Sequence, residues 1–428
     1  MRACWLAAMG SALCVIGTAF AQPGGESMML PAPVPTSPGS LSGPMSFSAD
    51  AASPDGAPLP YFPPIEVVSA SGPRYWFDAE YLLWWVKNDG LSAPLVVGGA
   101  DLDAIAAAGE IPVLLCCLPC YQESSGFGLG FGWWMDPFAS WGLEARGFLL
   151  EQQGRGARFR SDGSSLLGIP YIEAFTGNQE VLQIAGPFGF ASATSGALHA
   201  ATTTQAWGSE ANAIVNLKRS GLFTLDLITG FRYFGVDDSL SLIAHTSFDR
   251  PSIFMTDLTT YDLFRTNNRF YGGQLGLRGQ CRLGIWYLEA SGKLALGGTQ
   301  QTLTIDGWSN NTTIVYGELL PTLSGPSAGG IFAQLSNMGR HSGSRFAVLP
   351  EVKVRLGVEL LENVKSYVGY TFLYLSSVVR PGEQIDPVLN FSQGPAVMTI
   401  PGPVRPIPLM RRGDFWAQGL DFGLQIDF

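Results

Sequence analysis

From Arg74 onward the sequence alternates between apolar and polar residues with a period of two, in segments of about ten residues or more. In residues 74–87, for example, Tyr81 and Leu83 share one face of an extended chain, while Asp78 and Glu80 share the other. Since successive side chains of a strand point to opposite faces, each segment predicts a strand with one apolar and one polar face. Ten segments show this pattern: 74–87, 125–135, 141–151, 207–218, 221–235, 268–281, 284–297, 345–361, 364–379 and 414–428.

The links between these segments distinguish a membrane barrel from a soluble β-sandwich, which shows the same alternation. Each short link is followed by a long one, as tight periplasmic turns and large outer loops require. We therefore predict an all-β, antiparallel up-and-down transmembrane β-barrel of ten strands, with both ends of the barrel at the periplasmic side. The short links are 136–140, 219–220, 282–283 and 362–363, and the long links are 88–124, 152–206, 236–267, 298–344 and 380–413.

Twelve strands are the alternative count, because residues 239–244 and 299–306 within the long links are also β-like. These pieces are either strand extensions or hairpins outside the membrane.

The composition agrees with a membrane-embedded chain, since 46% of its 428 residues are hydrophobic and 14% are charged. A membrane-spanning helix needs about 20 consecutive apolar residues. Beyond the first residues no such stretch occurs, because Gly, Asp, Glu, Arg or Asn interrupts each apolar run. A closed barrel is the other structure that satisfies its backbone hydrogen bonds in lipid. The net charge of −10 argues against nucleic acid as a partner, since phosphates would be repelled.

The N-terminal residues 1–21 have the features of a secretory signal peptide. Arg2 gives a positive start, residues 3–17 are mostly apolar, and cleavage is expected after Ala21. A lipoprotein would use Cys14, but Leu13 before it is too bulky for that processing site. Residues 22–73 are rich in Pro, Gly and Ser, and predict a disordered periplasmic leader before the barrel of residues 74–428.

The last strand ends in Phe428 after apolar residues at alternate positions. This pattern is similar to the signal that the barrel-insertion machinery of the outer membrane reads, and we interpret Phe428 as that insertion signal. Together with the export signal it predicts an outer-membrane protein of a Gram-negative bacterium, with outer-membrane lipid and the insertion machinery as its partners. The sequence leaves the oligomeric state open.

Four cysteines follow the predicted cleavage site: Cys116, Cys117, Cys120 and Cys281. The spacing of Cys117 and Cys120 allows a disulfide or half of a metal site. A second ligand pair at metal-site spacing is missing, so a loop disulfide or plain loop residues are the favoured reading, and we predict no metal and no cofactor.

Several of these segments, taken in order over residues 74–428, resemble the beta-barrel porin-7 family of outer-membrane proteins. The resemblance implies an outer-membrane barrel and supplies no catalytic residues to carry over. The matching stretches include "YWFDAEYLLWWVK", "GFRYFGVDDSLSL", "FYGGQLGLRGQCRLGIWYLEASGKLALGGTQQ", "GGIFAQLSNMGRHSGSRFAVLPEVKVRLGVEL", "VGYTFLYLSSVVRPGEQID" and "DFWAQGLDFGLQIDF".

Charged residues on the polar faces are the candidates for the barrel interior. Their signs balance, so no ion selectivity follows, and we favour ion pairs that brace a narrow barrel over a transport pathway. Barrels of about eight strands are filled by side chains, and open channels need about sixteen. The fourteen lumen-facing candidates are Asp78, Glu80, Glu144, Arg146, Glu210, Lys218, Asp226, Arg232, Arg278, Glu289, Lys293, Glu351, Lys353 and Arg355.

We therefore expect a porin-like barrel that either passes small solutes or has a structural role in the envelope, without enzymatic activity. One alternative is an outer-membrane protease or lipase, which would use His245 near Asp249 or His341 near Ser342. Sequence neighbours alone give weak evidence for catalytic geometry, and we interpret both histidines as solvated loop residues. The other alternative is an adhesin acting through its long loops. The apolar run "IPVLLCCLPC" in the first long link predicts packing into the barrel mouth or against another loop.

Overall fold

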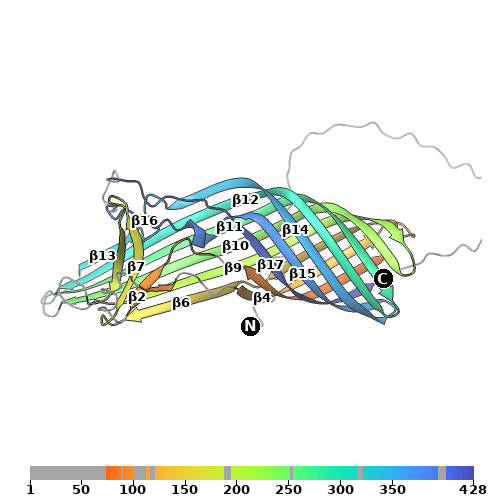
Figure 1. The fold of residues 1–428 in the computed structure, drawn as a ribbon, viewed down its shortest axis with the longest axis horizontal. Helices are drawn as coiled ribbons and strands as arrows, with labels where there is room; N and C mark the ends of the chain where they lie inside the picture. The colour runs from red at the N-terminus through yellow and green to blue at the C-terminus, as the bar shows by residue number, and fades with distance from the viewer. Residues whose placement is uncertain are drawn as a thin grey trace, which may run out of the picture. The chain divides into compact units, whose positions relative to one another are not determined.

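The computed structural model describes residues 74–87, 90–99, 112–115, 121–187, 194–250, 254–315, 322–393 and 402–428 (Figure 1). The predicted signal peptide and leader lie outside these residues. No helix in the described part of the chain is long and apolar enough to cross a membrane.

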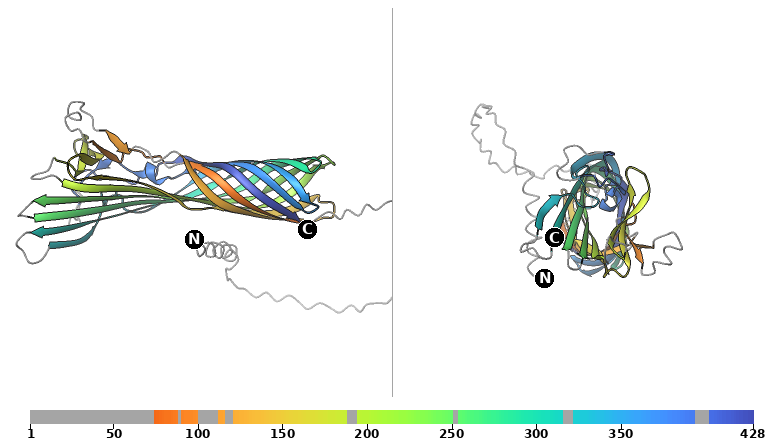
Figure 2. Two further views of the ribbon diagram at one scale, coloured as in Figure 1. Left: turned by 90° about the horizontal axis from the view of Figure 1, so that it is seen from below. Right: turned by 90° about the vertical axis from the view of Figure 1, so that its left-hand side faces the viewer.

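Among the described strands, ten antiparallel ones close into a ring, which confirms the prediction of ten over twelve (Figures 1 and 2). Each strand pairs with the next, and the last pairs with the first through a register that runs from Trp76 opposite Asp427 to Val86 opposite Ala417. Closure removes the unpaired sheet edges, which lipid does not tolerate. The ring consists of β1 (Tyr75–Lys87), β4 (Tyr121–Trp134), β5 (Trp141–Leu150), β9 (Thr194–Arg219), β10 (Phe223–Arg250), β11 (Phe254–Leu283), β12 (Trp286–Val315), β14 (Gly339–Leu361), β15 (Val364–Val378) and β17 (Gly413–Asp427).

Four tight turns join neighbouring strands at one end of the ring, as predicted. They connect β4 to β5, β9 to β10, β11 to β12 and β14 to β15. β1 begins and β17 ends at this same end, where the backbone N–H of Phe428 donates to the carbonyl of Tyr75 over 2.7 Å. We call this end the turn end and the opposite end the loop end. In outer-membrane barrels the short turns face the periplasm.

The long links are not simple loops, because β9 to β12 continue far beyond the ring. These four strands contain 26 to 30 residues, whereas a strand needs about 9 to 11 to cross a bilayer. The β-like pieces 239–244 and 299–306 belong to β10 and β12 and are strand extensions. The predicted link 236–267 is therefore largely the far part of the β10–β11 hairpin.

Further strands from the long links complete the loop end. β6 (Gln153–Ser161) pairs with β9 and β13 (Thr322–Ala328) pairs with β12, so both widen the sheet of extended strands. A second, small sheet has the order β16-β7-β2-β3, with β8 on β7. Its strands are β2 (Val96–Gly99), β3 (Val113–Leu115), β7 (Leu166–Glu173), β8 (Gln179–Ala185) and β16 (Val388–Leu389).

The ring near the turn end is apolar outside and polar inside. Leu275 and Leu277 of β11 point outward with 57% and 49% of their surface exposed, while inward Gln274 is buried. An outward row of aromatic residues, Trp207, Tyr233 and Tyr271, has neighbouring ring centroids 4.9 Å apart. Aromatic girdles mark the membrane boundary of outer-membrane barrels. We call the part between this girdle and the turn end the spanning half, and the rest the outer half.

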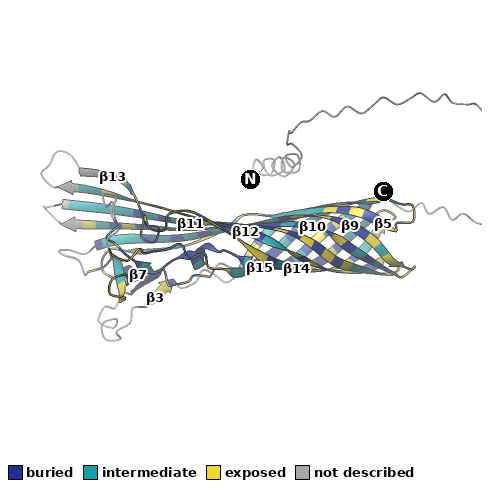
Figure 3. Cartoon of the chain, turned by 90° about the horizontal axis from the view of Figure 1, so that it is seen from above, coloured by how far each residue is buried: buried dark blue, intermediate teal, exposed yellow. Residues whose placement is uncertain are grey.

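The outer half has its own apolar core, which we call the outer core. It lies between the inner face of the extended strands and the small sheet, and includes Leu242 of β10, Phe264 of β11 and Ile305 of β12. Leu115 from the apolar run 111–120 is buried in it and pairs with Val96, whereas Val113 and Leu114 are exposed, so the predicted packing is seen for Leu115 alone among these three residues. Figure 3 shows the buried and exposed residues along these strands.

Residues 330–333 insert into the outer core and are held by one buried carboxylate. Asp262 of β11 accepts backbone hydrogen bonds from Phe332 over 3.0 Å and from Ala333 over 2.7 Å. The segment that follows β15, with a 3₁₀ helix at Pro381–Gln384, also folds inward, and Arg380 pairs there with Asp238 over 2.9 Å. These inserted segments fill the mouth of the barrel at the loop end.

Candidate functional site

Thirteen of the fourteen lumen candidates lie inside the spanning half, where they form three groups of ion pairs. The strands place them there because inward positions recur at every second residue. Most of their side chains are less than 10% exposed, which leaves them little contact with bulk water. The thirteen are Asp78, Glu80, Glu144, Arg146, Glu210, Asp226, Arg232, Arg278, Glu289, Lys293, Glu351, Lys353 and Arg355.

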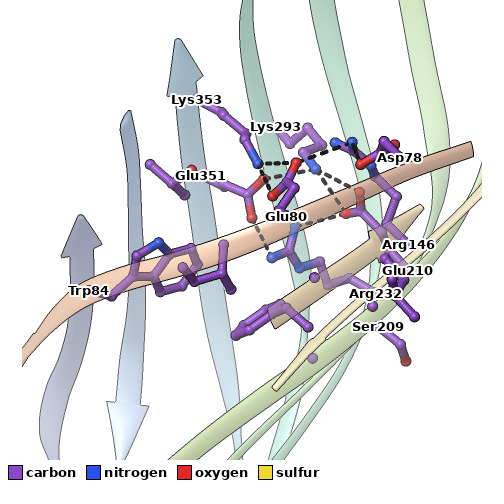
Figure 4. Close-up of a pocket in the computed structure, with 17 residues that line it drawn as sticks. Asp78, Glu80, Trp84, Arg146, Ser209, Glu210, Arg232, Lys293, Glu351 and Lys353 are labelled. Atoms are coloured by element: carbon purple, nitrogen blue, oxygen red, sulfur yellow. Dashed lines mark hydrogen bonds and ion pairs between the residues drawn. The ribbon is translucent and has the colours of Figure 1, made fainter. Parts of the chain in front are cut away.

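Four of these residues form a closed quartet in which each cation contacts both anions (Figure 4). The Nζ of Lys293 lies 2.7 Å from Glu210 and 2.8 Å from Glu351. The guanidinium of Arg232 lies 2.8 Å from Glu210 and also pairs with Glu351. The quartet connects β9, β10, β12 and β14, and its alternating signs offset the cost of burying each charge.

A second cluster surrounds Glu80 of β1. Its carboxylate accepts from Lys353 over 2.6 Å, from the hydroxyl of Tyr367 over 2.8 Å, and from Arg355. Arg146 lies 3.5 Å from the same carboxylate and 2.6 Å from Asp78. This cluster therefore connects β1 and β5 to β14 and β15.

Nearer the turn end a third group joins β11 to β10 and to β5, which lies three places away in the ring. Arg278 of β11 contacts Glu144 of β5 over 2.7 Å and Asp226 of β10 over 3.6 Å. Glu289 of β12 pairs with Arg355 over 3.3 Å and thereby belongs to the cluster around Glu80.

Lys218 is the exception, and its prediction as a lumen residue is wrong. The register of β9 and β10 shifts between Leu225 and Asp226, so Asn216 pairs with Asp226 while Lys218 pairs with Leu225. A bulge of this kind moves the following side chains to the other face. Lys218 thus shares the outward face of Leu225 and is exposed.

Some residues of the interior were not among the candidates. Asp421 of β17 accepts from the indole of Trp84 over 2.8 Å and lies 3.4 Å from Lys353. Its place on the polar face of the last segment was a sufficient signal to include it. Tyr367 gave no such signal, because an alternating tyrosine is equally typical of an outward girdle.

On the loop-end side of the charges an apolar layer crosses the lumen. Trp84, Phe148, Phe234 and Phe415 form a chain of rings with successive centroids 5.1, 6.1 and 5.7 Å apart. Phe234 belongs to β10 and Phe415 to β17, which lie five places apart in the ring of ten strands. Their contact therefore joins opposite walls.

The remaining space inside the spanning half is small at this level. A cavity of about 50 Å³ lies between the quartet, Glu80 and the apolar layer, which is room for a few water molecules. A larger space of about 770 Å³ opens at the turn end, with Arg74, Asp136, Arg219 and Lys365 among the residues that line it.

The two loop histidines have separate surroundings. Nδ1 of His245 lies 3.0 Å from the hydroxyl of Thr259, and its Nε2 lies 3.9 Å from Asp257. Nε2 of His341 lies 2.9 Å from the backbone carbonyl of Asn337. The side chain of Asp249, the predicted neighbour of His245, lies outside the described residues.

Of the four cysteines that follow the predicted cleavage site, the structure describes Cys281. Cys116, Cys117 and Cys120 lie outside the described residues, so the disulfide stays a prediction. Cys281 is a free thiol. Within the described ranges no three His, Cys, Asp or Glu side chains come together in a way that would hold a metal ion.

Solved structures with some likeness to this chain are outer-membrane barrels. The outer membrane protease OmpT from Escherichia coli is 10% identical with a TM-score of 0.40, covering 84% of this chain and 98% of that one. The beta domain of the Bordetella autotransporter BrkA is 9% identical with a TM-score of 0.23, covering 83% and 100%. A Pseudomonas aeruginosa FadL homologue is 8% identical with a TM-score of 0.21, covering 84% and 91%.

The sequence comparison with protein families is more specific. Among curated proteins no sequence matches this chain. A family model described as "Putative beta barrel porin-7 (BBP7)" matches residues 76–428, which is the whole ring from β1 to β17. The chain therefore belongs to this family of outer-membrane β-barrels.

Proposed function

We propose that this protein is a closed scaffold of the outer membrane, which holds its outer half above the membrane and conducts no solutes. The contact between Phe234 and Phe415 carries the proposal, because their centroids are 5.7 Å apart although their strands lie on opposite walls. A solute would have to displace both these rings and the ion pairs beneath them. Ten-stranded barrels are close to the size that side chains alone can fill.

The buried ion pairs support a structural role for the interior. A transport pathway needs groups that bind a solute and release it again, whereas the carboxylates of Glu210 and Glu351 are already occupied by Arg232 and Lys293. Removing one partner of such a buried pair leaves the other charge uncompensated, which costs about 3 to 5 kcal/mol. The quartet thus fixes the strands relative to one another.

Single-channel recording tests this proposal directly. The native protein, inserted into planar bilayers, is expected to show no steady conductance. The combined variant Phe234→Ala, Phe415→Ala, Arg232→Ser and Glu351→Ser removes the cross-lumen contacts and is expected to conduct, provided that it keeps heat-modifiable migration. Steady conductance of the native protein would contradict the proposal.

A matched control uses the outward face of the same strands. Phe231→Ala and Phe422→Ala remove two aromatic rings of equal size that are 51% and 41% exposed. Since these rings point away from the lumen, this control should remain silent. Conductance in the control would show that altered folding, and not an opened lumen, causes the current.

The proposal includes no catalytic activity. His245 is 48% exposed on the outward face of the extension, and its contacts are a threonine hydroxyl and a carboxylate 3.9 Å away. Hydrolysis of peptide or lipid that is abolished by His245→Ala or His341→Ala would favour the enzyme alternative instead.

A further inference from the structure

β6 is an edge strand in the outer half and carries three arginines within six residues. It pairs with β9 from Gln153 opposite Thr204 to Ser161 opposite Gly196. Its other edge has no strand partner among the described residues. Edge strands present unpaired backbone groups, so the side chains along them determine what approaches.

The three arginines, Arg155, Arg158 and Arg160, are exposed. No carboxylate of the described residues forms an ion pair with any of them, in contrast to Arg269 of β11, which pairs with Asp237. Arg158 and Arg160 point to the outer face, and Arg158 lies opposite His199. Arg155 lies opposite the inward Thr202. The cations thus flank the free edge from both faces, in a chain whose net charge is −10.

The height of these three arginines above the membrane limits which molecules of the membrane can contact them. Leu149 of β5 pairs with the girdle residue Trp207, while Arg155 and Arg160 pair with Thr202 and Ala197, five and ten residues further along β9. A rise of about 3.3 Å per residue and a tilt of about 40° place these arginines roughly 13 to 25 Å beyond the girdle. A phospholipid headgroup layer is only about 5 to 8 Å thick.

We propose that the free edge of β6 binds the phosphate groups of a glycolipid in the outer leaflet. Planar guanidinium groups donate paired hydrogen bonds to phosphate oxygens, and the charge of the patch is complementary to that ligand. A phosphorylated sugar headgroup extends to the height of the arginines, which phospholipid headgroups do not reach. Gly154 and Gly156 add no side chains of β6 to the outward face below Arg158, where the side chains of Thr203 and His199 of β9 lie next to the strand.

The competing explanation is that the arginines only keep the edge from pairing with other strands, as charges on edge strands often do. In that case their removal would cause self-association and would leave glycolipid binding unchanged. The two explanations therefore differ in what the same variant does.

The test measures binding of purified lipopolysaccharide with phosphorylated core sugars to the full mature chain in phosphatidylcholine nanodiscs. Combining Arg155→Gln, Arg158→Gln and Arg160→Gln is expected to weaken binding at least about tenfold, since several charge-assisted hydrogen bonds are lost. The native protein should bind the enzymatically dephosphorylated lipopolysaccharide equally weakly. Nanodiscs containing phosphatidylglycerol, and free inorganic phosphate, should compete poorly if the sugar-bound phosphates are the ligand.

The matched control changes two other exposed arginines of the outer half, Arg265→Gln and Arg340→Gln. Neither lies on β6, so the control should bind like the native protein. Heat-modifiable migration verifies the fold of each variant. Unchanged binding in the triple variant, or an equal loss in the control, overturns the proposal. This outcome does not depend on whether the barrel conducts.

Discussion

The spanning half and the outer half are built from the same strands but have opposite polarity. Along β10 the inward residues Asp226 and Arg232 give way to Leu240 and Leu242 of the outer core. On the outward face the apolar residues of the spanning half give way to polar ones such as Ser239. Backbone pairing continues unbroken through this change.

This inversion shows that the apolar face of a strand is determined by its surroundings and not by its register. In lipid the outward face must be apolar, whereas in water an apolar interior is favoured by burial. The Phe234–Phe415 contact marks the level at which the interior changes from charged to apolar.

The largest expected effect comes from breaking the charged interior of the spanning half. Arg232→Met leaves Glu210 and Glu351 with Lys293 as the one remaining cation of the quartet, and should lower the free energy of unfolding by about 3 to 5 kcal/mol. Urea unfolding of the protein in lipid vesicles measures this change. Adding Glu351→Gln should recover part of the loss, and equal stability of the single and double variants would contradict a role for the quartet.

A second, smaller effect on stability is expected from replacing an outward leucine in the spanning half, where the cost should exceed that of the same replacement in the outer half. Leu275→Arg places a cation among acyl chains and should destabilise the barrel by about 2 to 4 kcal/mol. Leu263→Arg, twelve residues along the same strand and also outward, should leave stability nearly unchanged because it lies beyond the girdle. The pair has the same original residue and strand, so similar costs at both positions would refute the boundary drawn at Trp207, Tyr233 and Tyr271.

The smallest effect concerns the outer core and depends on pH. Burial raises the pKa of Asp262 to about 7, well above its ordinary value. The folded state therefore binds this proton more tightly than the unfolded state, and the stabilisation is lost as pH rises through about 7. Between pH 8 and pH 6 the protection of the Phe332 and Ala333 amides against hydrogen exchange should rise roughly tenfold.

Asp262→Asn is the matched variant for this effect, because its side-chain oxygen keeps both acceptor positions. Protection in the variant, corrected for intrinsic exchange, should be independent of pH over the same range. A native protein without this pH dependence would show that the carboxylate of Asp262 is not the responsible group.

The sequence was sufficient to predict the ring, because lipid enforces a strict alternation in the spanning half. Strand number, turn positions and the common end of β1 and β17 all followed from it. The lengths of β9 to β12 did not follow, since the apolar positions move from odd to even residues in β10 as the strand leaves the membrane. A fixed phase of alternation therefore ends the predicted strand at residue 235, although the strand continues to Arg250.

The sequence predicted which face of each strand carries the charged residues of the candidate site, but not which of these residues pair with one another. Alternation assigned fourteen charged residues to the interior, and the structure places thirteen of them there in clusters that depend on strand order and stagger. Lys218 does not follow this rule, because a β-bulge cannot be recognised from an alternating sequence pattern. The arginines of β6 were not recognised, since they lie in a link for which no strand had been predicted.

The small sheet imposes an order of assembly on the molecule. Val97 pairs with Gly168, and Val388 pairs with Ile172, so the sheet needs segments that are more than 200 residues apart in the chain. Pairings between such distant segments form late. The parallel pair of β16 with β7 uses a segment from the link before the last strand, so the outer half acquires its final form only once nearly the whole polypeptide is in place.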